Sequence, residues 1–257
     1  MPYINQGASR LYYEKQGDGP PIVLLHGVGG NHASWFHQMV AWREKATVIA
    51  VDARGFGNSS DVEELGRSGF VDDLECVLDA LSLARVAIVA QSMGGGAAAA
   101  FTVRSPERVG ALVLADTLVG LDLPDDIAAR MKALAKTTDG LTQLQRVLGP
   151  TFLNAQPVQS YLYTALASFN DTNVKTLRGV QQSVSPTALG ASNVPVLFVA
   201  GAEDVLFPPE EIHAVQKLTA GSDYLEIAAA GHSAYFEQPA IFNRDVYDWL
   251  AHQMQWS

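Results

Sequence analysis

The segment 86–104 constrains the fold most, because it passes from an apolar run to a helix-forming run with almost no connection between them. Residues 86–90 are apolar and partly β-branched, as expected of a strand that is buried on both faces. The residues after Ser92 are rich in alanine and favour a helix. Only a tight turn centred on Ser92 can join the two elements, and the small residues Ala90 and Gly94 permit the close approach that such a turn needs.

Other apolar runs of strand length alternate with segments of helical periodicity. The strand-like runs are apolar throughout instead of alternating with polar residues, which predicts a mostly parallel central sheet flanked by helices on both faces. The fold class is therefore α/β. The predicted strands are residues 3–5, 10–16, 22–25, 47–51, 86–90, 109–115, 194–200 and 223–227, and the predicted helices of the sheet layer are 34–44, 69–83, 97–104, 209–219 and 239–254.

The alternation of strands and helices is interrupted between residues 118 and 191. This stretch contains helix-like pieces, such as 127–136, 141–148 and 158–169, but no convincing strand. We therefore expect a helical cap, or lid, at 118–191, inserted into an α/β core formed by residues 1–117 and 192–257.

Composition limits the partners of the chain. Its 257 residues include 27 acidic and 17 basic side chains, for a formal charge of -10, which argues against nucleic acid and membrane surfaces as partners. No signal peptide or membrane-spanning run is evident, and the single cysteine allows no intrachain disulfide. We expect a cytoplasmic monomer or homodimer that acts on a small molecule.

Three polar residues follow predicted strands in the chain order serine, aspartate, histidine. Ser92, Asp204 and His232 would all lie at the carboxyl ends of parallel strands, where open α/β sheets place their ligand sites. A serine hydroxyl needs a base such as histidine to become a nucleophile, and a carboxylate fixes the tautomer of that histidine. The alternatives to Asp204 as the acid are its neighbour Glu203 and Asp116, which follows another strand.

Backbone groups near the serine could stabilise negative charge on an attacked carbonyl. The amide of Met93 follows Ser92, and the amide of Val28 lies in a glycine-rich loop, so the two form a predicted oxyanion hole. His26 and Gly27 would support that loop. The loop lacks the Lys-Ser/Thr pair of a nucleotide-binding site, and no motif has metal-ligand spacing, so we predict no cofactor and no metal.

Taken together, these motifs resemble those of the α/β-hydrolase superfamily over nearly the whole chain. The order of the three polar residues, the His26-Gly27 loop and the turn at 52–57 match that family's pattern in sequence order. One departure is Ala90, where the family's signature normally has glycine. The resemblance implies the α/β-hydrolase fold with Ser92 as nucleophile.

Among related families, the chain is most similar to small bacterial carboxylesterases, enol-lactonases and acyl-homoserine-lactone lactonases. The resemblance implies a cofactor-independent hydrolase of small esters or lactones that forms an acyl-enzyme. One alternative is a carbon–carbon bond hydrolase of ring-cleavage products, or a non-metal perhydrolase, and another is a non-catalytic hydrolase-like receptor. Within the cap, the predicted substrate pocket comprises Phe152, Tyr161, Tyr163 and Phe169.

Overall fold

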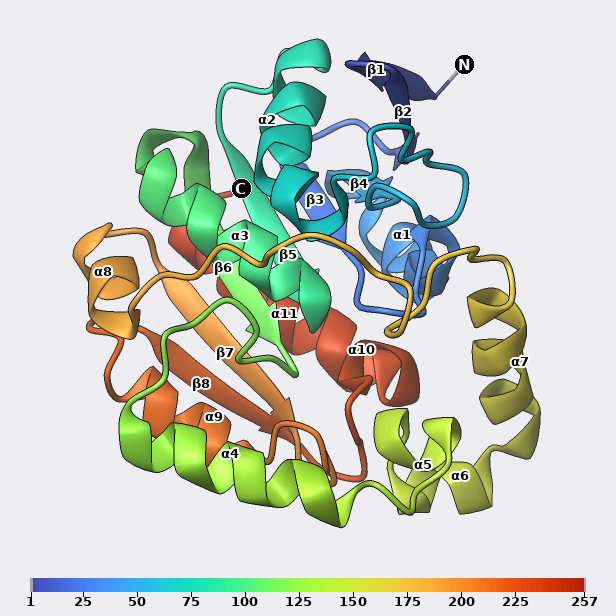
Figure 1. The fold of residues 1–257 in the computed structure, drawn as a ribbon. Helices are drawn as coiled ribbons and strands as arrows, with labels where there is room; N and C mark the ends of the chain where they lie inside the picture. Colours follow the sequence, from blue (N-terminus) through green and yellow to red (C-terminus); the bar gives the residue numbers. More distant parts are fainter. Residues whose placement is uncertain (1, 257) are drawn as a thin grey trace.

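The computed structural model describes residues 2–256, and its centre is one eight-stranded sheet (Figure 1). The strand order is β1-β2-β4-β3-β5-β6-β7-β8. The pairs β1–β2 and β2–β4 are antiparallel, and all the other neighbouring strands are parallel. The strands are β1 (Tyr3–Gln6), β2 (Ser9–Gln16), β3 (Pro21–Leu25), β4 (Thr47–Val51), β5 (Val86–Gln91), β6 (Val109–Ala115), β7 (Val196–Gly201) and β8 (Asp223–Ile227).

Helices cover both faces of the sheet, which explains why the central strands are apolar at every position. Along β5, Ile88 and Ala90 belong to one hydrophobic cluster, whereas Ala87 and Val89 belong to the cluster on the opposite face. The described α-helices are α1 (Phe36–Trp42), α2 (Phe70–Ala80), α3 (Met93–Arg104), α4 (Asp125–Thr137), α5 (Gln143–Val147), α6 (Pro150–Ala155), α7 (Pro157–Ala167), α8 (Pro186–Ala191), α9 (Pro209–Gln216), α10 (Ala234–Glu237) and α11 (Pro239–Met254).

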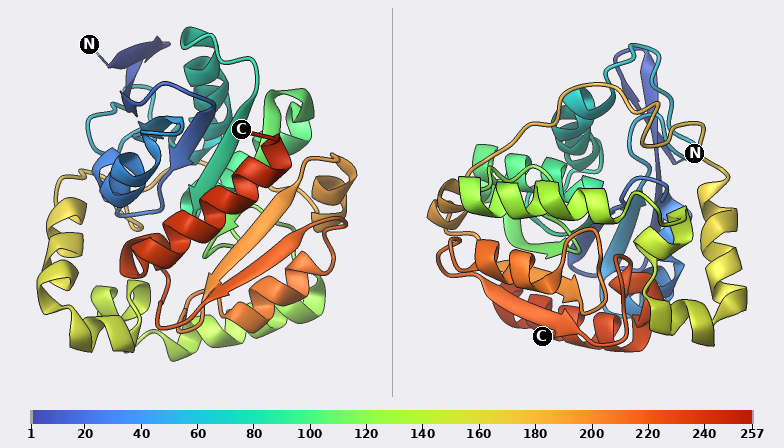
Figure 2. Two further views of the ribbon diagram at one scale, coloured as in Figure 1. Left: turned by 180° about the vertical axis from the view of Figure 1, so that it is seen from behind. Right: turned by 60° about the horizontal axis from the view of Figure 1, so that its bottom comes forward.

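The two helical layers differ in their members. Helices α2, α3 and α9 pack on one face, and α1 and α11 pack on the other, where α11 crosses the back of the sheet (Figure 2, left). Within α11, the buried residues Phe242, Val246 and Leu250 recur every four positions and form the stripe that faces the sheet. The predicted α/β class, with helices on both faces of a mostly parallel sheet, is confirmed.

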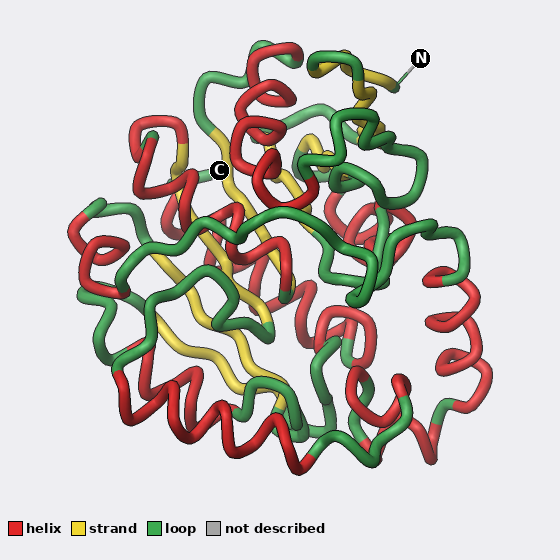
Figure 3. The backbone as a smooth tube through the Cα atoms, viewed as in Figure 1, coloured by secondary structure: helices red, strands yellow, loops and turns green. Residues whose placement is uncertain are grey.

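The chain between β6 and β7 contains α4 to α8 and no named strand. Helices α4 to α7 lie along the edge beyond the carboxyl ends of the strands (Figure 2, right), whereas α8 packs against α3. A long loop, visible in green in Figure 3, connects α7 to α8 and contacts the first turn of α3, where Gln181 lies against Gly96. The division into a core and a cap at 118 and 191 stays a prediction.

Sequence periodicity located the long elements better than the short ones. The predicted helix 239–254 coincides with α11, whereas α6, α8 and α10, each of four to six residues, were not predicted. The helix expected at 34–44 is divided into a 3-10 turn, η1 (His32–Trp35), and α1. Two other 3-10 turns are η2 (Gly66–Gly69) and η3 (Pro106–Arg108). Within residues 2–256, no helix is long and apolar enough to cross a membrane.

Candidate active site

Ser92 lies in a strained turn between β5 and α3. Its φ of 49° and ψ of -116° fall outside the regions that a residue with a side chain prefers. The turn brings α3 so close to β3 that a Cβ atom on Gly94 would lie 2.6 Å from the Leu25 carbonyl oxygen. Glycine is therefore required at position 94, while the methyl group of Ala90 is fully buried within β5.

The structure brings the three predicted polar residues into one hydrogen-bonded chain. The His232 Nε2 atom is 3.0 Å from the Ser92 Oγ atom, and the His232 Nδ1 atom is 2.9 Å from a carboxylate oxygen of Asp204. Burial alone would lower the pKa of His232, but the charge and hydrogen bond of Asp204 outweigh it and raise that pKa above 6.5. This arrangement orients His232 between a hydroxyl and a carboxylate.

Asp204 is fixed by the loop that follows β7. Its Oδ1 atom accepts hydrogen bonds from the backbone amides of Leu206 and Phe207, at 2.8 and 3.0 Å. Its Oδ2 atom therefore remains directed at His232. The carboxylate has no rotational freedom to leave the histidine without losing both backbone contacts.

Asp116 is also buried nearby but is not hydrogen-bonded to the histidine. Its Oδ1 atom accepts from the Gly201 amide at 2.8 Å, and its Oδ2 atom accepts from the Ala234 amide at 3.0 Å. Burial, together with the charge of Asp204, raises the pKa of Asp116 to about 8. Asp116 thus connects the last residue of β7 to the first residue of α10, just after His232, and Asp204 is the carboxylate that contacts the ring.

Two further side chains hold the His232 loop, and neither was singled out from the sequence. Gln91, which precedes the serine, donates to the His232 carbonyl oxygen at 2.7 Å. Glu237 accepts from the amides of Gly231 and Ser233 on either side of the histidine. A glutamate five residues after the histidine, at the end of a four-residue helix, gives no recognisable sequence signal.

Glu237 also links this loop to the α4–α7 region. Its second carboxylate oxygen accepts from the Gly149 amide, which immediately precedes α6, at 2.7 Å. Burial raises the pKa of Glu237 to about 7, against the opposing effect of the three backbone amides. Close by, the Ser233 hydroxyl donates to the Tyr163 oxygen at 3.0 Å. The position of the histidine loop therefore depends on contacts from α6 and α7.

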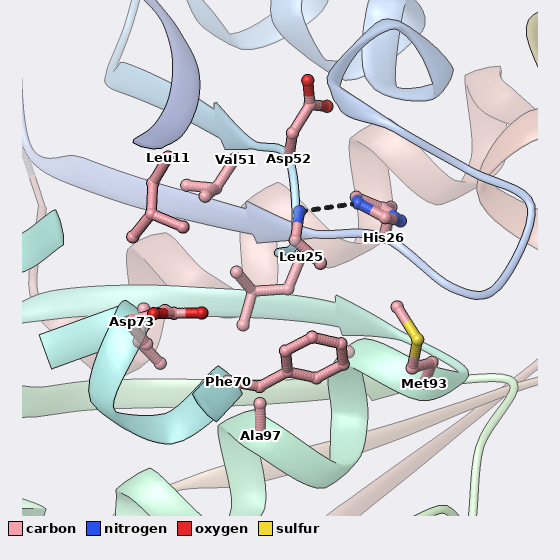
Figure 4. A pocket seen from close by; sticks show the side chains of 12 residues that line it. Leu11, Leu25, His26, Val51, Asp52, Phe70, Asp73, Met93 and Ala97 are labelled. Carbon is pink, nitrogen blue, oxygen red and sulfur yellow. Dashed lines mark hydrogen bonds between the residues drawn. The ribbon is translucent and has the colours of Figure 1, made fainter. Parts of the chain in front are cut away.

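His26 connects the glycine-rich loop to the end of β4 (Figure 4). The Ala53 amide donates to its Nε2 atom at 2.9 Å, so the ring proton resides on Nδ1, which donates to the Gly27 carbonyl oxygen at 2.8 Å. Burial lowers the pKa of His26, which keeps the ring neutral in this role. Gly27 itself has no room for a side chain, since a Cβ atom there would lie 2.8 Å from that of Ser92.

The amides of Val28 and Met93 are available to a ligand. Neither donates a hydrogen bond within residues 2–256, and both residues line the cavity that contains Ser92. Met93 is the first residue of α3, where backbone amides lack helical partners. Their joint use as an oxyanion hole remains a prediction.

A second, smaller cavity of about 40 Å³ lies between the ends of β3 and β4 and the helices α2 and α3 (Figure 4). It is lined mainly by apolar side chains, such as Leu25, Phe70 and Ala97, and Ser92 is not among them. Met93 lines both cavities. The smaller cavity has room for very few water molecules, so we do not assign it to the substrate.

The cavity beside Ser92 measures about 480 Å³. Its lining residues differ from most of those predicted for the substrate pocket. Only Tyr163 of the four predicted aromatic residues lines it. Phe152 is buried against Phe236, and Tyr161 and Phe169 are 76% and 71% exposed. The actual wall is formed by residues from η2, α4, α5, α7 and the loop after β7, including Arg67, Met131, Ala135, Arg146, Val147, Leu206 and Phe207.

A family model and a curated relative both match most of this chain. A family model described as the alpha/beta hydrolase fold matches residues 20–239. The 2-hydroxy-6-oxononadienedioate/2-hydroxy-6-oxononatrienedioate hydrolase of Paraburkholderia xenovorans is 30% identical, and the alignment covers 96% of this chain and 92% of the relative.

Solved structures extend the similarity to the whole fold. Est816, described as an N-acyl homoserine lactone degrading enzyme, is 26% identical with a TM-score of 0.80, and the match covers 96% of this chain and all (100%) of that one. A thermophilic esterase from Thermogutta terrifontis has a TM-score of 0.81 at 24% identity, with 98% of each chain covered. The esterase therefore supports the similarity of fold alone.

Proposed function

The chain belongs to the α/β-hydrolase family, and from that premise we propose that it is a serine hydrolase of small carboxylic esters or lactones. The observation that carries this proposal is the pair of contacts made by His232. One ring nitrogen lies 3.0 Å from the Ser92 hydroxyl and the other lies 2.9 Å from Asp204, at the wall of a cavity of about 480 Å³. Such a cavity is large enough for a small organic molecule.

In the proposed reaction, the Ser92 oxygen attacks the substrate carbonyl carbon while the His232 Nε2 atom takes the hydroxyl proton. Asp204 stabilises the resulting imidazolium. The amides of Val28 and Met93 donate hydrogen bonds to the carbonyl oxygen as it becomes negatively charged. The protonated histidine then gives its proton to the leaving alkoxide, and an acyl-enzyme remains on Ser92.

Water completes the cycle by the same groups. His232 removes a proton from a water molecule, which attacks the acyl carbonyl, and the proton passes to the Ser92 oxygen as the carboxylic acid departs. A lactone would follow the same path, except that its alcohol and acid remain parts of one product. Besides the substrate and this water molecule, every group in the mechanism belongs to the chain itself.

The experiment is a panel of 4-nitrophenyl esters and unsubstituted lactones of increasing carbon number, assayed with the wild type and with Ser92→Ala. We expect turnover of short esters by the wild type and a loss of at least about 10³-fold in the variant. Absence of ester and lactone turnover in the wild type would favour the non-catalytic receptor. If only esters turn over, the lactone part of the proposal fails.

A second candidate activity is hydrolysis of a carbon–carbon bond next to a carbonyl. It is favoured by the 30% identity to the Paraburkholderia xenovorans dienedioate hydrolase over 92% of that relative. The same nucleophile and base would serve this reaction. Assay of 2-hydroxy-6-oxononadienedioate beside the ester panel separates the candidates, because a higher kcat/KM for the dienedioate than for any ester would favour the second.

A further inference from the structure

Arg67 lines the Ser92 cavity without a protein partner for its buried guanidinium nitrogen. The residue belongs to η2, and its Nε atom is inaccessible to solvent yet has no hydrogen-bond acceptor within residues 2–256. Buried donors in folded proteins are normally paired, because an unpaired one loses its contacts with water and gains nothing in return. The two terminal nitrogens of Arg67 also make no hydrogen bond within residues 2–256 but are not buried, so they are the part of the guanidinium that a ligand in the cavity can contact.

Most arginines outside this cavity have carboxylate partners. Arg54 pairs with Asp73 at 2.5 Å, and Arg130 pairs with Glu211 at 2.6 Å. Carboxylates are abundant, since the chain has 27 acidic residues against 17 basic ones. Arg10 and Arg85 also have no carboxylate partner in the described residues, but both are exposed to solvent, whereas the Nε atom of Arg67 is buried.

A second arginine enters the same cavity from α5. Arg146 donates from Nε to the Thr138 carbonyl oxygen at 3.1 Å and from one terminal nitrogen to the Asp139 carbonyl oxygen at 3.3 Å. These backbone contacts fix its orientation but leave its charge uncompensated, because no carboxylate lies within ion-pair distance of it in residues 2–256. The two arginines reach the cavity from different parts of the fold, because α2, which follows η2, and α5 are well separated in Figure 1.

The remaining charge at the cavity wall does not cancel the two arginines. The only carboxylate side chain among the described lining residues is that of Asp139, which is exposed to solvent. Apolar side chains, including Met131, Val147 and Leu206, supply most of the other surface. The cavity thus combines a net positive charge with an apolar wall, in a chain whose overall charge is -10.

We infer that the natural substrate bears a carboxylate in addition to the carbonyl that Ser92 attacks, and that Arg67 is the principal residue that binds it. A guanidinium presents paired donors that match the geometry of a carboxylate. Arg146 contributes a second positive charge to the same cavity. This inference rests on the proposed function, because it identifies the substrate class of the same site.

The test uses two esters of equal chain length that differ in one charge, mono-4-nitrophenyl adipate and 4-nitrophenyl hexanoate. We expect the wild type to have the higher kcat/KM for the adipate, by roughly 10- to 100-fold, as for a hydrogen bond to a charged group. This preference should decrease with added salt. Arg67→Gln should remove most of the preference, Arg67→Lys should retain part of it, and Arg146→Gln should reduce it less.

The matched control is Arg178→Gln, which removes an exposed arginine that pairs with Glu64 outside this cavity. It should leave the ratio of the two kcat/KM values unchanged. Equal kcat/KM values for both esters in the wild type, or an unaltered ratio in Arg67→Gln, would overturn the inference while hexanoate turnover still supported the proposed function. Failure of the wild type to turn over either ester would instead contradict the proposed function.

Discussion

At the scale of single residues, two buried aspartates near His232 differ in what they contact. Asp204 contacts the ring, and its other oxygen is held by two backbone amides. Within residues 2–256, Asp116 hydrogen-bonds only to backbone amides, and burial with the charge of Asp204 raises its pKa to about 8. Replacement of each by asparagine therefore has a different expected consequence.

Asp204→Asn should lower kcat by about 10³- to 10⁴-fold, because the amide oxygen stays with the backbone donors and the amide NH₂ faces His232 Nδ1. That contact places the ring proton on Nε2, the wrong nitrogen for accepting a proton from Ser92. Asp116→Asn should retain kcat within about 10-fold, because Asp116 hydrogen-bonds to neither His232 nor Ser92. The new NH₂ group would face one of the two backbone donors, so the main cost should fall on the free energy of unfolding. Ester hydrolysis by both variants is the measurement, and an equally deep loss in Asp116→Asn would make Asp116 the catalytic acid.

The protonation of His232 sets the expected pH dependence. Because Asp204 raises the pKa of the ring despite burial, the neutral base becomes the main form only at a pH higher than for an ordinary histidine. The kcat/KM of the wild type should therefore rise with pH, with its midpoint above 6.5. In Asp204→Asn, burial acts without the opposing carboxylate, so the midpoint of the His232 titration, followed by NMR of the ring protons, should fall. An unchanged midpoint would exclude Asp204 as the cause of the raised pKa of His232.

At the scale of elements, the histidine loop depends on α6 and α10 as well as on the sheet. Glu237, at the end of α10, binds amides of the histidine loop and the amide of Gly149 at the start of α6. The carboxyl group is buried, and its pKa is raised to about 7 from an ordinary 4.5. The unfolded chain therefore releases this proton at lower pH than the folded chain does.

The free energy of unfolding should consequently fall as pH rises from about 5 to 8. Stability from a raised pKa is complete below the unfolded value and is lost as pH rises through the folded value. Glu237→Gln should reduce this slope by up to about 1.4 kcal/mol per pH unit, leaving the part due to Asp116. Urea unfolding at several pH values measures this slope, and Glu107→Gln, at an exposed position, is the control. Equal slopes in Glu237→Gln and the wild type would contradict the assignment of this pH dependence to Glu237.

At the scale of the whole molecule, the sequence predicted the sheet because its strands are short apolar runs that end in polar or glycine-rich loops. The same pattern located Ser92, Asp204 and His232, since residues at the carboxyl ends of neighbouring parallel strands must meet at one edge. Tight steric requirements, such as glycine at position 94, are also visible in sequence. The apolar period and the turn residues therefore carry most of the information about the sheet layer.

The cavity wall was less predictable because it depends on how short helices dock. Tyr161 and Tyr163 both belong to α7, but a separation of two residues places them on nearly opposite faces of a helix. Tyr163 faces the cavity and Tyr161 faces solvent, and no local pattern distinguishes them. Arg67 was missed for a related reason, since η2 reaches the cavity only through the packing of distant segments.

The central claim is that Ser92 is the nucleophile of a hydrolase, and covalent labelling tests it most directly. The protein would be treated with a fluorophosphonate, which reacts with activated serines, and analysed by intact mass and peptide mapping while ester hydrolysis is followed. We predict one adduct per chain, on Ser92, with activity lost in proportion to labelling and no adduct in Ser92→Ala. Full ester hydrolysis after complete labelling, or an adduct on a different serine that accounts for the loss, would contradict the claim.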